Sequence, residues 1–119
     1  MPRQVTFRFE RRPSPLFGSV HRPVALVKLW SRKLRGWVQV AMLVDTGADY
    51  TLLPQVYASH FGIDLPREGH AFTTMGIGGR ERVSLVRRWP MQVGPWRRQI
   101  PLGFLPRNDV PPLLGRQAC

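Results

Sequence analysis

The residues best suited to chemistry follow a short apolar segment. Residues 40–44 are all apolar and lead directly into Asp45, Thr46 and Gly47. An ionised carboxylate at the end of a buried strand costs free energy unless hydrogen bonds or a shared proton offset that cost. Asp45 therefore has either a structural partner or a catalytic one. Gly47 allows the backbone to turn sharply, and the Thr46 hydroxyl can hold the turn in place.

Two further motifs follow in the sequence. The first is glycine-rich and reads Met75-Gly76-Ile77-Gly78-Gly79, and the second places Gly and Arg after an apolar pair, in Pro112-Leu113-Leu114-Gly115-Arg116. Each motif alone has an ordinary explanation, because an Asp can simply cap a turn and two glycines can simply form a hairpin turn. Three motifs in this order are far more specific than any one of them.

Together these segments resemble the motifs of the retropepsin-like aspartic proteases, the single-domain, retroviral type. Residues 43–53 resemble the active-site motif, residues 75–79 the flap and residues 112–116 the late apolar-apolar-Gly-Arg element. The resemblance covers roughly residues 24–116. It implies an all-β fold, a small closed barrel with a flap hairpin and one short helix, and it implies aspartic endopeptidase activity without a cofactor or metal.

The chemistry of such an enzyme requires two carboxylates about 3 Å apart that share one proton. The seven acidic residues include a single Asp-Thr-Gly motif, so the pair must come from two chains related by a twofold axis. A chain of 119 residues is also short for enclosing a large cleft in addition to its core. The sequence therefore predicts a homodimer with one Asp45 from each subunit, acting on a peptide or protein substrate in extended conformation.

The resemblance also implies roles for individual residues. Besides Asp45, Thr46 would interlock with its counterpart in the partner subunit, and Gly47 would present its carbonyl to the substrate. Ala48 and Asp49 would line neighbouring subsites. The other substrate-binding candidates are the flap residues Met75, Gly76, Ile77, Gly78 and Gly79. The supporting residues are Thr51, Leu114, Gly115 and Arg116, and Arg116 would pair with Asp49.

The elements that must position these residues are mainly strands, as 11 Gly and 12 Pro favour turns and short segments. Pro54 suits the first turn of a helix and Gly62 the position just beyond its end, which predicts one short helix over residues 54–61. Gly78 and Gly79 are predicted to form the turn of a long hairpin. Alternating or β-branched and aromatic residues predict strands at 5–9, 24–30, 37–44, 70–77, 80–87, 89–93 and 99–105.

One domain is expected over residues 1–119, with an N-terminal strand and loop in residues 1–22. Retropepsin-like chains usually continue past the late element into a short helix and a terminal strand that pairs across the dimer, and we expect both to be absent because the sequence ends at Cys119. Three alternatives stay open: a fragment, a dimer that depends more on residues 5–9, or an inactive protein.

The net charge of +11 is most simply explained by a solvated basic surface, with acidic partners as the alternative. Nucleic acid is possible but not favoured, because the arginines are spread along the chain and form no single basic helix. The alternative function is a catalytically inactive binding module of the same fold that holds an acidic protein or nucleic acid on its basic surface. The three histidines and one cysteine lack metal-site spacing. No signal peptide or membrane segment is apparent, so we expect a cytoplasmic protein with no membrane partner.

Overall fold

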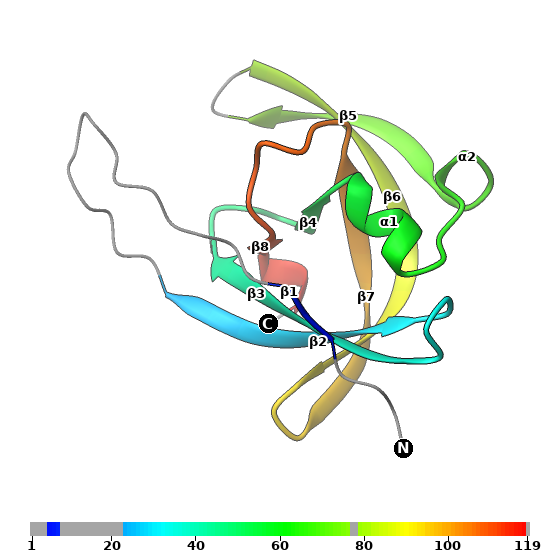
Figure 1. Ribbon diagram of the computed structural model, residues 1–119. Helices are drawn as coiled ribbons and strands as arrows, with labels where there is room; N and C mark the ends of the chain where they lie inside the picture. The colour runs from blue at the N-terminus through cyan, green and yellow to red at the C-terminus, as the bar shows by residue number, and fades with distance from the viewer. Residues whose placement is uncertain (1–4, 8–22, 77–78, 119) are drawn as a thin grey trace.

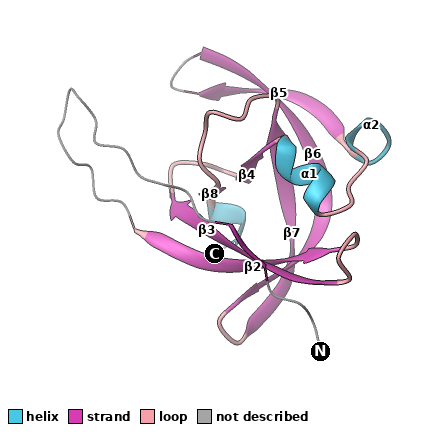
Figure 2. Ribbon diagram, viewed as in Figure 1, coloured by secondary structure: helices cyan, strands magenta, loops and turns pink. Residues whose placement is uncertain are grey.

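The computed structural model describes residues 5–7, 23–76 and 79–118. Strands dominate these residues, and the helices are short (Figures 1 and 2), so the predicted all-β class is confirmed. The strands are β1 (Val5–Phe7), β2 (Val24–Ser31), β3 (Gly36–Val44), β4 (Thr51–Pro54), β5 (His70–Gly76), β6 (Gly79–Val93), β7 (Trp96–Leu105) and β8 (Leu113–Leu114). The helices are α1 (Val56–His60), α2 (Leu65–Glu68) and the 3-10 turn η1 (Arg116–Ala118).

The sheet closes on itself to form a barrel. Its strand order is β1-β3-β2-β6-β7-β4-β8, and β8 also pairs with β3, which completes the ring from β3 round to β8. One edge of β3 carries β2 along nearly its whole length. Its remaining pairings are parallel, with β1 at residues 38–40 and with β8 at Leu43 and Val44. The two-residue strand β8 therefore closes the barrel next to the end of β3.

The barrel interior follows from the two-residue period of the strands. Val27 and Leu29 of β2 are fully buried, as are Val38, Val40 and Met42 of β3, while the residues between them are more exposed. Alternation of this kind places one set of side chains in the core and the other on the outer surface. The strands are thus held by an apolar interior, and their ends can carry polar loops.

Several sequence predictions differ from the structure in detail. The strands predicted at 80–87 and 89–93 form the single strand β6, because a bulge between Val86 and Trp89 changes the register without ending the pairing. The short helix occupies Val56–His60 within the predicted 54–61, and α2, β4 and β8 were not predicted. Of the strand predicted at 5–9, residues 8 and 9 lie outside the described residues.

The long hairpin was predicted correctly, but its turn was shifted. Gly76 of β5 pairs with Gly79 of β6, so Gly79 belongs to the strand and not to the turn. The two residues between them, Ile77 and Gly78, lie outside the described part of the chain. In Figure 1, β6 runs from this hairpin at the top of the molecule to a second hairpin with β7 at the bottom.

Candidate active site

Asp45 lies in the loop that joins the end of β3 to the start of β4. Its backbone N–H donates to the carbonyl of Leu114 at 3.0 Å, and the Gly47 N–H donates to Asp45 Oδ1 at 3.0 Å. The Asp45 side chain is half-buried, whereas Thr46 and Gly47 are exposed. The sharp turn at Gly47 thus fixes the carboxylate at the surface end of an otherwise apolar strand, where it remains accessible.

The segment that follows β8 supports this loop from behind. The backbone N–H of Arg116 donates to the Ala48 carbonyl at 2.9 Å. The Arg116 guanidinium also forms an ion pair with Asp49. Both partners are exposed, so the pair by itself contributes little to stability. The backbone bond and the ion pair together nevertheless fix the second half of the Asp45 loop against η1.

A second contact between these segments is buried. Thr51 has no exposed surface, and its Oγ1 accepts a hydrogen bond from the Gly115 N–H at 3.2 Å. A Cβ atom at Gly115 would lie 2.3 Å from the Tyr50 carbonyl oxygen. Only glycine allows the two backbones to approach so closely. The glycine of the late motif is therefore explained by packing against the residues that follow Asp45.

The loop borders a cavity of about 660 Å³. Of the candidates named from the sequence, Asp45, Gly47, Ala48 and Asp49 line it. Thr51, Leu114 and Gly115 are buried, and Arg116 is exposed. Among the described residues, the lining of the cavity does not include Thr46, Thr51, Leu114, Gly115 or Arg116. The predicted flap candidates Met75, Gly76 and Gly79 are in the hairpin strands, and Ile77 and Gly78 lie outside the described residues.

The wall opposite the loop includes residues that the sequence analysis did not single out. Phe72 and Thr74 of β5 line the cavity, as do Glu81 and Val83 of β6. Phe72 pairs directly with Val83, and Thr74 with Glu81, so the four side chains share one face of the hairpin. The two-residue period of these strands was a usable signal for this face. The remaining lining residues are Tyr50, Leu52, Leu105, Arg107, Val110 and Leu113.

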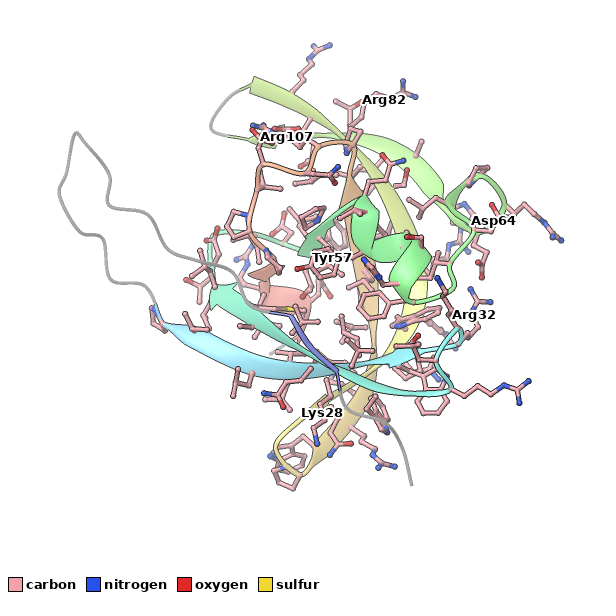
Figure 3. All side chains as sticks on the ribbon, viewed as in Figure 1. Lys28, Arg32, Tyr57, Asp64, Arg82 and Arg107 are labelled. Carbon is pink, nitrogen blue, oxygen red and sulfur yellow. The ribbon has the colours of Figure 1, made fainter. Side chains whose placement is uncertain are left out.

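An ion-pair network crosses the rim of the cavity. Arg107, in the loop between β7 and β8, contacts Asp109 through Nε–Oδ1 and Nη2–Oδ2 distances of 2.6 Å. Its Nη1 lies 3.0 Å from Glu81 Oε1, and Figure 3 shows Arg107 beside the β5–β6 hairpin. Hydrogen bonding to the Arg107 guanidinium lowers the pKa of Asp109. The network therefore connects the rim loop to the hairpin wall.

The described residues contain no group of His, Cys, Asp or Glu side chains that could hold a metal ion. Within the same residues, no helix has both the length and the apolar character needed to cross a membrane. The cavity lining itself supplies carboxylates from Asp45, Asp49 and Glu81 and a guanidinium from Arg107.

A comparison with known families agrees with this geometry. The family model described as gag-polyprotein putative aspartyl protease matches residues 33–118. The chain belongs to this aspartyl protease family. The matched region of this family member includes the Asp45 loop, the β5–β6 hairpin and the Gly115 segment, and it supports a protease-like function in general. No curated protein sequence matches the chain.

Proposed function

We propose that the chain is an aspartic endopeptidase that acts as a homodimer, with one Asp45 from each subunit forming the catalytic pair. The observation that carries this proposal is the position of Asp45, which is half-buried and lines a cavity of about 660 Å³ opposite the β5–β6 hairpin. Asp45 is supported by its own loop, and Thr46 beside it is exposed. An exposed Thr46 is compatible with contact to a second subunit.

In the proposed reaction, one of the two carboxyl groups acts as a general base and the other as a general acid. One is ionised and takes a proton from a water molecule, whose oxygen attacks the peptide carbonyl carbon. The other is protonated and donates to the carbonyl oxygen, which gives a tetrahedral intermediate. Collapse of this intermediate breaks the C–N bond, and the departing amine takes up a proton. Because one proton is shared, we expect activity to be highest at acidic pH.

The substrate in this proposal is an extended peptide between the Asp45 loop and the hairpin. Backbone groups of β5 and β6 near the turn would hydrogen-bond to the peptide as a neighbouring strand does, which requires little sequence specificity. Ala48 and Asp49 would contact side chains next to the cleaved bond. Phe72 and Val83 add an apolar surface to the same cavity, so we expect a preference for apolar side chains at one or more subsites.

The proposal is tested by a peptide-library cleavage assay at acidic pH, run beside sedimentation of the same sample. We expect a dimer that cleaves peptides, and Asp45→Asn should abolish cleavage while the dimer and the fold are kept. Asp64→Asn is the matched control, because Asp64 lies at the start of α2, away from the cavity (Figure 3).

Two results would overturn the proposal. One is a folded dimer that cleaves no peptide in the library, which would favour the inactive binding module. The other is cleavage that survives Asp45→Asn, or a rate that keeps rising through about pH 8, since two carboxylates sharing a proton lose that proton well before then.

A further inference from the structure

The charges of the molecule are unevenly distributed. Strands β2, β3 and β7 contain no acidic residue, and neither does β6 beyond Glu81. Of these strands, β2, β6 and β7 carry exposed or half-exposed basic residues, among them Lys28, Arg97 and Arg98. The acidic residues of the described chain lie near the cavity and α2; they are Asp45, Asp49, Asp64, Glu68, Glu81 and Asp109. The excess positive charge is therefore concentrated on the sheet.

Strand register gathers part of this charge on the outer face of the barrel. Lys28 of β2 pairs with Gln39 of β3 and Gln92 of β6, and Gln92 pairs with Arg97 of β7. Trp30 pairs with Trp37 in a neighbouring row. These positions alternate with the buried core residues and so face outward. We call this surface the cationic sheet face: Lys28, Trp30, Trp37, Gln39, Gln92 and Arg97.

The cationic sheet face is organised by contacts between its own side chains. The Arg97 guanidinium carbon lies 5.3 Å from the centre of the Trp37 ring, and its Nε donates to Gln92 Oε1 at 2.8 Å. Trp30 and Trp37 pack edge to face with centroids 5.4 Å apart. Trp96 is 76% exposed, but it pairs with Val93 and therefore points to the opposite face of the hairpin from Arg97. Planar groups and positive charge thus lie together, with their geometry partly fixed before any ligand arrives.

We propose that the cationic sheet face binds single-stranded nucleic acid. Phosphates would contact Lys28 and Arg97, and unpaired bases would stack on the half-exposed indoles of Trp30 and Trp37. An acidic protein would pair with the positive charges but would offer no planar group to stack on the aromatic rings. A duplex keeps its bases stacked inside, so they cannot stack on these rings either. The site is separate from the cavity: Figure 3 shows Lys28 near the bottom of the molecule and Arg107 near the top.

The proposal is tested by fluorescence anisotropy with the full chain and a labelled single-stranded oligonucleotide of about 12 nucleotides. A duplex of equal length and a polyglutamate peptide serve as competitors. We expect binding that weakens with salt, and Lys28→Gln or Arg97→Gln should each lower the slope of log affinity against log salt by about 0.7. Trp30→Ala should weaken binding about fivefold or more, with circular dichroism used to check that the variant folds. Trp96→Ala removes an exposed indole on the other face of the hairpin and should have little effect.

Arg82→Gln is the matched charge control, since Arg82 is an exposed arginine at the far end of the molecule from Lys28 (Figure 3). It should weaken binding less than Arg97→Gln does. The proposal is overturned if the oligonucleotide does not bind at low salt, or if Arg82→Gln and Arg97→Gln weaken binding equally. It is also overturned if Trp30→Ala weakens binding no more than Trp96→Ala does, or if the duplex or polyglutamate competes as well as the single strand. Peptide cleavage is not part of this test, so it stands or fails independently of the proposed activity.

Discussion

At the scale of single residues, Thr51 contributes more to the stability of the fold than its small side chain suggests. Its buried hydroxyl accepts the Gly115 N–H, a backbone donor in a buried segment. Thr51→Val keeps the shape of the side chain but removes this buried hydrogen bond, whose net contribution is about 0.5–1.5 kcal/mol. We therefore expect urea denaturation to show a loss of this size for Thr51→Val. Thr51→Ser keeps the hydroxyl and should lose clearly less, and equal losses would contradict the role assigned to the hydrogen bond.

Gly115 gives a second prediction at this scale. Because a Cβ would lie 2.3 Å from the Tyr50 carbonyl oxygen, Gly115→Ala must push two backbone segments apart, at a cost of about 1–3 kcal/mol or more. Gly94→Ala is a useful comparison, since φ there is +53° but nothing lies within 4 Å of the new atom. Thermal unfolding should rank Gly115→Ala as the more damaging change. The opposite rank would show that the close approach can relax.

At the scale of elements, the β5–β6 hairpin is connected to the rim loop by Glu81 and Arg107. Glu81→Gln removes the charge on the hairpin side, and we expect faster hydrogen exchange of hairpin amides because one restraint on its opening is lost. Glu68→Gln on α2 breaks a similar ion pair, with Arg32 of the β2–β3 turn, and should leave hairpin exchange unchanged. Unchanged exchange in Glu81→Gln would mean that the pair does not restrain the hairpin.

The same elements also show what the sequence could predict. Strands with clear alternation were placed within a few residues, since their pattern reflects the inner and outer faces of the barrel. The strands β4 and β8 were missed because they are too short to show a period, and they exist through long-range pairing with β7 and β3. The motifs located Asp45 and its supporting segment. They could not reveal the contact between Glu81 and Arg107, which depends on where the β5–β6 hairpin and the β7–β8 loop meet in space.

At the scale of the whole molecule, stability should fall at both extremes of pH. The Arg32 guanidinium and the Asp64 N–H lower the pKa of Glu68, and Arg107 lowers that of Asp109. Their contributions are complete above the ordinary carboxyl values, about 4, and are lost as pH falls through the lowered folded values. Burial raises the pKa of Tyr57 above 10.0, so the folded state keeps that proton longer, and stability falls as pH rises beyond about 10.

Urea midpoints measured from about pH 2 to 11 test these expectations, with a plateau expected between about pH 5 and 9. Glu68→Gln should make the acidic limb shallower, and Tyr57→Phe should do the same for the alkaline limb. If stability falls as steeply at high pH in Tyr57→Phe as in the unchanged protein, groups other than Tyr57 cause that loss. Because the pKa of Asp109 is lowered, its ion pair with Arg107 at the rim of the cavity persists into the acidic range in which an aspartic protease would work.

The closure of the barrel by β8 also has a consequence for the order of events during synthesis. The Asp45 N–H donates a hydrogen bond to the Leu114 carbonyl, and Leu43 pairs with Leu113. The loop is therefore supported by residues that are translated much later. Contacts between such distant segments form late in folding. We therefore expect a nascent chain to carry no assembled Asp45 loop until residues 113–117 have left the ribosome. Until then, Asp45 would lie at the end of β3 in a loop without its backbone support, even though β2 and β3 have already been synthesised.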